Sequence, residues 1–343
     1  MNDEGICSIC SGWSSTERNW EDLERAFVQK IDSLRGSAEY DAALMMSGGK
    51  DSAYLAWLLK REYGLNILGI TIDNNFEYAE TFERAAEIAD ALEISHLQFK
   101  PTPGRVNEFY RFIMTNPALR EKDCGQLCLY CGKFLLDQGL NFVSHMGIPA
   151  VFVGYNPDQL FGMGKMLEFE TELPRQRQQE AILRKMTHQF NKALNLAAEA
   201  ELHGIVPFFE DSPSSFQVIY PFQYLPYKPN DMMETVIREL NWKPISAFSK
   251  GTYIASGCKL LKLMAFIARE NSVSTYMDFE FSNQIRQGLL TREMLKDFYD
   301  GLEEDESFYI EVLEKLGINL SLCVPGADKL CRQVNDNSPE KPL

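Results

Sequence analysis

A glycine turn between an apolar run and a helix-periodic segment constrains the fold of this chain more than any other feature. The turn is Met46-Ser47-Gly48-Gly49-Lys50-Asp51-Ser52, and a short apolar run from Asp41 precedes it. Apolar residues at helical spacing follow it, at Tyr54, Leu55, Leu58 and Leu59. A strand–turn–helix of this kind places backbone N–H groups and a positive helix end where an anion can bind. The two glycines lack a Cβ, so a phosphate can approach the backbone, while serine hydroxyls and a lysine add donors.

Strand and helix patterns alternate along the first two thirds of the chain. We predict strands at 41–46, 66–72, 95–99, 150–153 and 218–220, and helices at 17–34 (with Thr16 as its N-cap), 80–92, 133–146 and 180–202. After Pro221 the pattern predicts helices alone, at 231–240, 260–268, 279–285, 292–299 and 307–316. This order predicts an α/β fold with a parallel, doubly wound sheet. Ligands bind at the carboxyl ends of such strands, where the glycine turn, Asp73 and the segment 154–158 all fall.

Four regions follow from these patterns. They are an N-terminal arm with a helix (1–36), an α/β domain (37–225), a helical C-terminal region (226–331) and a polar tail expected to be disordered (332–343).

The net charge of −15 argues against a protein whose main task is to grip nucleic acid, so we expect weak binding to bulk tRNA. The acidic N-terminus and the lack of a long apolar run predict a cytoplasmic protein with no membrane segment. In that compartment the eight cysteines are expected to be metal ligands or catalytic thiols and not disulfides.

Two Cys-x-x-Cys pairs are candidate metal ligands. Cys128 and Cys131 can clasp an ion or a cluster edge, because thiolates are the soft ligands that zinc and iron–sulfur clusters prefer. A redox dithiol and buried structural cysteines are the alternatives. Cys7 and Cys10 form half of a structural zinc site, which Cys323 and Cys331 would complete if the two ends of the chain meet.

The glycine turn resembles the Ser-Gly-Gly-x-Asp-Ser pyrophosphate loop of the N-type ATP pyrophosphatases, which have a Rossmann-like (HUP) fold. The resemblance implies cleavage of ATP to AMP and pyrophosphate, with Mg²⁺, and adenylation of a substrate oxygen. It assigns pyrophosphate binding to Ser47, Gly48, Gly49, Lys50, Asp51 and Ser52, with Lys50 and Asp51 catalytic. It also places Asp73 at the adenosine pocket, where the alternative is a capping or loop-stabilising residue.

The segment Gly154-Tyr155-Asn156-Pro157-Asp158-Gln159 resembles the Thr-Gly-His-Asn-x-Asp-Asp segment of tRNA-thiolating members of the superfamily. The resemblance implies that Gly154, Asn156 and Asp158 help to hold the nucleotide phosphate and its magnesium. Tyr155 and Gln159 depart from the pattern, so a role that needs two carboxylates is in doubt. The alternative is an ordinary loop rich in turn-forming residues.

The central pair, with Gly132 and Lys133 after it, resembles the tRNA two-thiolation enzymes, which hold an iron–sulfur cluster with Cys-x-x-Cys and one distant cysteine. By its order in the chain, that third ligand would be Cys258. Cys124 is left over, as a fourth ligand, a catalytic thiol or a free cysteine.

The flanks resemble a different group, the N-acetyl sugar amidotransferases, which take ammonia from a glutaminase partner. The matching segments are 5–10, 220–227, 240–242 and 283–293. The two resemblances agree on ATP and disagree on the nucleophile.

From these features we predict an ATP-dependent sulfurtransferase with a 4Fe–4S cluster. Its substrate would be a small molecule, such as a heterocyclic base or a natural-product intermediate, and its sulfur donor sulfide or a cysteine desulfurase-type protein. A homodimer fits this prediction. The rivals are the amidotransferase and a non-enzymatic nucleotide sensor, although a sensor need not keep an intact pyrophosphate loop.

Overall fold

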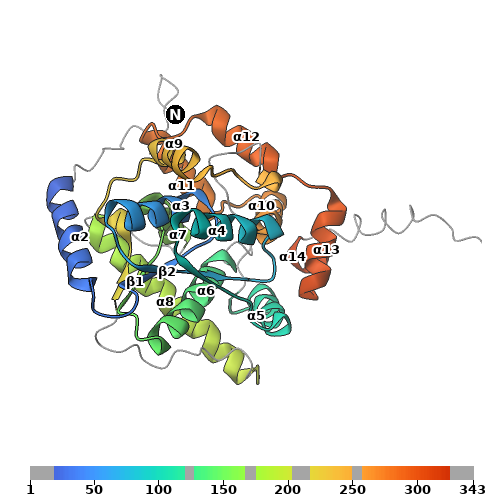
Figure 1. Cartoon of the computed structure of the whole chain (residues 1–343). Coiled ribbons are helices and arrows are strands. Elements are labelled where there is room, and N and C mark those ends of the chain that lie inside the picture. Colours follow the sequence, from blue (N-terminus) through green and yellow to red (C-terminus); the bar gives the residue numbers. More distant parts are fainter. Residues whose placement is uncertain (1–18, 120–126, 167–174, 203–216, 249–256, 325–343) are drawn as a thin grey trace, which may run out of the picture.

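A five-stranded parallel sheet forms the centre of the molecule (Figure 1). The computed structural model describes residues 19–119, 127–166, 175–202, 217–248 and 257–324. The strands lie in the order β3-β2-β1-β4-β5. Their bounds are β1 (Ala42–Met45), β2 (Ile67–Ile72), β3 (Ser95–Phe99), β4 (Ala150–Phe152) and β5 (Gln217–Ile219). The predicted parallel, doubly wound sheet is therefore confirmed, with each strand close to its predicted bounds.

The strand order reverses at β1, which pairs with β2 on one side and β4 on the other. Leu44 lies opposite Gly69 of β2 and Phe152 of β4. In doubly wound sheets the crevice at such a reversal, outside the carboxyl ends of the strands, is where ligands bind. The glycine turn follows β1 and therefore lies at this point.

Helices cover both faces of the sheet. Residues of α2 (Trp20–Leu34), α3 (Lys50–Trp57), α4 (Ala79–Leu92) and α9 (Pro229–Leu240) share one core cluster with Ala42 and Leu44 of β1. Residues of α6 (Leu127–His145) share another with Ala43. Successive residues of a strand point to opposite faces, so a strand buried on both faces is continuously apolar.

The remaining helices pack around this sheet and form a cap over its carboxyl edge. Helix α11 packs closely on α7: a Cβ at Gly162 would press into the carbonyl oxygen of Tyr276. The other elements are η1 (a π-helix, Leu58–Glu62), α5 (Pro103–Thr115), α7 (Pro157–Met166), α8 (Arg175–Glu199), η3 (Pro221–Gln223), η4 (Ser246–Phe248), α10 (Lys259–Glu270), α11 (Tyr276–Arg286), α12 (Arg292–Leu302), α13 (Glu306–Leu316) and α14 (Leu320–Cys323).

Three local predictions need correction. Helix α6 begins at Leu127, before the central cysteine pair and not after it, because the buried Leu127 and Tyr130 anchor an extra first turn in the core. The side chain that caps α2 is Asn19, which accepts a hydrogen bond from the Asp22 backbone, whereas Thr16 lies outside the described residues. A helix, α7, also follows the Gly154–Pro157 turn. Among the described residues, no helix combines the length and the apolar character that crossing a membrane requires.

Candidate active site

The loop Ser47–Ser52 holds its shape through its own short hydrogen bonds. The Ser52 hydroxyl donates to the carbonyl of Gly49 (3.0 Å) and accepts from the backbone N–H of Ser47 (3.2 Å). Gly49 is the extended N-cap of α3, and Gly48 has a positive φ of 72°. A Cβ at Gly48 would also press into the Thr81 carbonyl oxygen. The loop thus has the strand–turn–helix setting that the resemblance to ATP pyrophosphatases implies.

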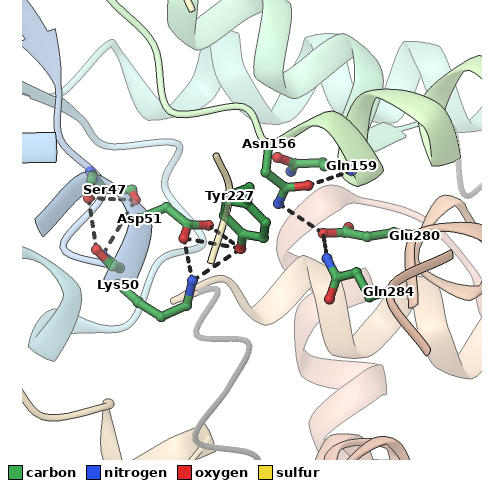
Figure 2. Close-up of polar contacts among 10 residues, drawn as sticks. Ser47, Lys50, Asp51, Asn156, Gln159, Tyr227, Glu280 and Gln284 are labelled. Carbon is green, nitrogen blue, oxygen red and sulfur yellow. Dashed lines mark hydrogen bonds and ion pairs between the residues drawn. The ribbon is translucent and has the colours of Figure 1, made fainter. Parts of the chain in front are cut away.

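Lys50 and Asp51 form a polar cluster with a tyrosine from a distant segment (Figure 2). Lys50, only 4% exposed, pairs with Asp51. The Tyr227 hydroxyl lies 3.1 Å from Lys50 Nζ and donates to both Asp51 carboxylate oxygens, at 3.2 and 3.3 Å. Tyr227 was not predicted as a site residue, although it belongs to a segment that resembles the amidotransferases. The cluster holds the lysine charge at the start of α3, where a phosphate would need it.

A second distant residue fixes the loop from outside. The indole N–H of Trp242 donates to the Gly48 carbonyl oxygen (3.0 Å). Tyr227 lies just before α9 and Trp242 just after it. Their hydrogen bonds connect the loop to both ends of this helix, so the helical region stabilises the loop conformation.

A cavity of about 360 Å³ opens beside the loop. Its wall includes loop residues from Ser47 to Ser52, the carboxyl ends of β1 and β2, and parts of α6, α7 and α11. Cys128, Cys131 and Cys258 line the same cavity. The structure therefore brings the predicted nucleotide loop and the three predicted central cysteines to one enclosed space.

Two separate elements, α6 and the start of α10, deliver these cysteines. Cys128 and Cys131 lie in the first turns of α6, three residues apart, where side chains share a helix face. Cys258 is the N-cap of α10, and its backbone forms an isolated antiparallel β-bridge with that of Glu77. Asn74 joins them, because its Nδ2 lies 3.3 Å from Cys258 Sγ and 3.8 Å from Cys131 Sγ.

The cysteine end of the cavity holds neutral groups. Burial raises the pKa values of Cys128 and Cys131 to about 12, and it raises the pKa of Cys258 well above its ordinary value. Burial, with the nearby charge of Asp73, also raises the pKa of Glu77 to about 7. In the metal-free protein the thiols are therefore protonated, and binding a metal would release protons.

The donor set determines which metal group would fit. In the described part of the chain, no group of three or more His, Cys, Asp or Glu side chains is arranged to hold a single metal ion. A mononuclear zinc needs four ligands around one point, whereas an iron–sulfur cluster is larger and spreads its thiolates over several irons. Three soft thiols line the cavity, and thiolates are the ligands that iron–sulfur clusters take, so the type of donor fits a cluster.

Two predicted carboxylates do not line this cavity. Asp73 accepts a hydrogen bond from the Asn75 backbone (2.7 Å) and pairs with Lys100 (2.7 Å), which is the loop-stabilising alternative. Asp158, at the start of α7, accepts hydrogen bonds from Asn283 (2.5 Å) and Gln287 (2.7 Å) of α11. Their sequence neighbours line the cavity instead, namely Asn74 beside Asp73 and Gln159 beside Asp158.

Gly154 and Asn156 do line the cavity, and their role at the nucleotide stays a prediction. Asn156 is 3% exposed, and its amide donates to Glu280 of α11 (3.1 Å, Figure 2). Burial raises the pKa of Glu280 to about 8, helped by the negative charges of Asp158 and Asp51. The sequence analysis did not select Glu280, since an isolated glutamate in a helix gives no local signal.

Of the other predicted cysteine ligands, Cys323 alone lies within the described residues, and it does not line this cavity. Cys323 is buried in α14, in a core cluster with residues of α5, α10 and α13. Cys7, Cys10, Cys124 and Cys331 lie outside the described residues. The zinc site at the two ends of the chain and the role of Cys124 thus stay predictions.

Comparison with known proteins gives distant similarities. No family model matches the chain. An uncharacterised protein of Methanocaldococcus jannaschii is 23% identical over 158 residues, which are 45% of this chain and 53% of that protein. The chain thus spans about half the length of the curated relative that it matches.

Three solved structures are similar in the course of the backbone. The tRNA thiolase NcsA of Methanococcus maripaludis, with its 4Fe–4S cluster, is 15% identical with a TM-score of 0.38, over 94% of this chain and 90% of that one. The NMN synthetase of Francisella tularensis is 12% identical with a TM-score of 0.37, over 88% and 98% of the chains. The NH3-dependent NAD synthetase of Campylobacter jejuni is 13% identical with a TM-score of 0.34, over 89% and 96%.

Proposed function

We propose that this chain is an ATP-dependent enzyme that adenylates a carbonyl-type oxygen of a small molecule and then replaces that oxygen with sulfur. One observation carries the proposal: the loop Ser47–Ser52 and the thiols of Cys128, Cys131 and Cys258 line the same cavity. A substrate bound there would have the phosphate-binding loop on one side and the sulfur ligands on the other.

In the first step the substrate oxygen attacks the α-phosphorus of ATP. An oxygen–phosphorus bond forms, the bond to the β-phosphate oxygen breaks, and pyrophosphate leaves. The loop N–H groups and Lys50 would stabilise the negative charge on that leaving group. Tyr227 would keep Lys50 and Asp51 in position through its hydroxyl. Mg²⁺ would accompany the phosphates, as it does in other ATP sites where carboxylates and water complete its shell.

In the second step a sulfur nucleophile, supplied as hydrogen sulfide, adds to the activated carbon and AMP leaves with the original oxygen. The sum is carbonyl compound, ATP and H₂S giving thiocarbonyl compound, AMP and pyrophosphate, with no change of oxidation state. Cys128, Cys131 and Cys258 would hold a 4Fe–4S cluster, which supplies an iron that activates sulfur as a nucleophile. Asn74 would hydrogen-bond to the ligand sulfurs, as it does to two of these thiols.

The size and charge of the protein favour a small substrate. The cavity of about 360 Å³ has the size of a pocket for a small molecule. The net charge of −15 opposes binding to a polyanion such as tRNA. In the cell a cysteine desulfurase-type protein would deliver the sulfur as a persulfide, which a thiol reductant would convert to sulfide while it is itself oxidised to a disulfide. Two copies of the chain would form the enzyme.

The test is a product analysis under anaerobic conditions with ATP, a candidate carbonyl substrate and either sulfide or ammonium. The proposal expects AMP, pyrophosphate and a thiocarbonyl product with sulfide. ADP and orthophosphate would exclude an adenylating enzyme. Turnover with ammonium that persists in Cys128→Ser and Cys258→Ser variants would establish the amidotransferase alternative, which the resembling flank segments support.

A further inference from the structure

Helix α11 presents one polar stripe to the cavity. Tyr276, Glu280 and Gln284 are spaced by four residues, which places them on one face of the helix. All three line the cavity, together with Met277 and Phe281. The stripe belongs neither to the pyrophosphate loop nor to the cysteine trio, although it lines the same cavity.

The hydrogen bonds within the stripe leave one strong acceptor without a partner. Asn156 Nδ2 (3.1 Å) and Gln284 Nε2 (3.3 Å) both donate to the same carboxyl oxygen, Oε1 of Glu280 (Figure 2). Gln284 is 1% exposed, and its Oε1 has no hydrogen-bond partner among the described residues. An unpaired buried acceptor is costly, so a site that keeps one is built for a donor that arrives with a ligand.

The second carboxyl oxygen of Glu280 supplies the complementary group. It receives no hydrogen bond from any residue in the described ranges, whereas Oε1 accepts two. Glu280 is only 8% exposed, no cation forms an ion pair with its carboxyl within the described ranges, and burial raises its pKa, so the protonated form is favoured. A protonated carboxyl that accepts through Oε1 donates through its other oxygen. The stripe therefore offers one donor beside one acceptor, with no net charge.

We propose that Glu280 and Gln284 bind the edge of a planar cyclic amide, a lactam whose ring carbonyl accepts from Glu280 and whose adjacent ring N–H donates to Gln284. The assignment of that carbonyl as the oxygen to be exchanged for sulfur rests on the proposed function. The Tyr276 ring, one turn earlier on the same face, gives a flat surface for an unsaturated ring.

The position of the stripe suits a substrate that meets both halves of the cavity. The charges of Asp51 and Lys50 act on Glu280, which places Glu280 close to the pyrophosphate loop. Tyr276, at the other end of the stripe, lies close enough to Cys128 and Cys258 for their ionisation to influence its pKa. A lactam on this stripe would lie between the phosphate-binding loop and the thiols.

The test compares two ligands that differ by one hydrogen bond, carbostyril, a bicyclic lactam, and its N-methyl derivative, which lacks the N–H. Binding is measured by ligand-observed NMR and calorimetry on the full chain, with and without ATP. We expect carbostyril to bind at least about tenfold more tightly, because the N-methyl compound leaves the Gln284 acceptor unpaired. Gln284→Met should remove this preference. Glu280→Gln should keep it, because an amide N–H can replace the carboxyl O–H.

The matched control is Gln138→Met, which makes the same change at a buried glutamine of α6 that does not line the cavity. It should leave the preference intact, and thermal unfolding shows whether each variant is folded. Equal binding of the two compounds, no binding of either, or a preference that survives in Gln284→Met would overturn the inference. So would a Gln284→Met variant that weakens ATP or Mg²⁺ binding alone, since the stripe would then serve the adenine or the metal.

The inference and the proposed function can fail separately. Cleavage of ATP to ADP would end the proposed function and leave the ligand preference as measured. Equal binding of the two compounds by an enzyme that makes AMP and pyrophosphate would overturn the inference alone.

Discussion

The two ends of the cavity are built in opposite ways. At one end, consecutive residues from Ser47 to Ser52 carry the polar groups, and their own hydrogen bonds fix the turn. At the other end, Cys128 and Cys131 come from α6 and Cys258 from the start of α10. The first end is charged, with Lys50 and Asp51 in contact, whereas the second holds neutral thiols.

This difference shows how each end can fail. The contiguous loop is held by its own hydrogen bonds, with Tyr227 and Trp242 adding support from beside α9. Single substitutions in it should therefore affect the chemistry and leave the fold intact. The dispersed trio of cysteines depends on how α6 and α10 pack in their shared core cluster. Metal binding by the trio therefore needs both helices in place. Four experiments test this comparison.

Lys50→Met should have the largest effect. It removes the buried charge at the phosphate-binding end, and we expect pyrophosphate release to fall on the order of a hundredfold or more. Pyrophosphate is measured with a coupled assay, and the iron content should equal that of the native protein. A variant that fails to fold would show that the loop is structural, contrary to the comparison.

Tyr227→Phe should reduce pyrophosphate release about tenfold, because it removes the hydroxyl that contacts both Lys50 and Asp51. Its matched control is Tyr63→Phe, at a ring that packs on Phe27 of α2 and does not line the cavity. An unchanged rate in Tyr227→Phe would mean that the loop needs no support from the helical region.

Cys258→Ser tests the dispersed end. The protein purified without oxygen should hold about four irons per chain, and the serine variant fewer than about one. Cys128→Ser and Cys131→Ser should behave in the same way, while all three variants keep ATP binding. Because the raised thiol pKa values favour protonation, iron uptake should strengthen as pH rises.

The control for iron binding is Cys323→Ser, which changes a buried cysteine outside the cavity. This variant should hold as much iron as the native protein. Zinc in place of iron, or iron that remains in all three variants at the cavity, would contradict the cluster assignment.

Glu280→Gln should have the smallest effect, on the pH dependence of stability. The folded pKa of Glu280, about 8, lies above its usual value of 4.5, so between these values the folded state binds more protons than the unfolded state. The free energy of unfolding therefore falls as pH rises through this window, by about 1 kcal/mol per pH unit from this group. Urea unfolding at several pH values should show a flatter profile in the variant. Identical slopes would mean that Glu280 is ionised in the folded protein.

The sequence by itself determined the features that depend on near neighbours. The alternation of apolar runs and helix-periodic segments predicted the five described strands, most plainly β1, β2 and β4, because burial on two faces demands a continuous apolar strand. The glycine turn and its helix were predicted from a contiguous motif and the helical spacing after it. The structure adds that Gly48 has a positive φ and lies close to the Thr81 carbonyl. Cys128 and Cys131 were recognisable as a pair because their spacing is local.

Only the tertiary structure decided which distant side chains complete the site. Cys258 was selected from the order of a resembling family, and packing alone places it beside Asn74. Tyr227 and Gln284 lie in segments that resemble the amidotransferases, but nothing local singled them out within those segments. Glu280 carried no signal, because a single glutamate suits any helix. The same packing took Asp73 to Lys100 and Asp158 to α11, away from the cavity. Neighbours along the chain set backbone conformation, but the contacts of a side chain depend on elements that meet only when the whole chain has folded.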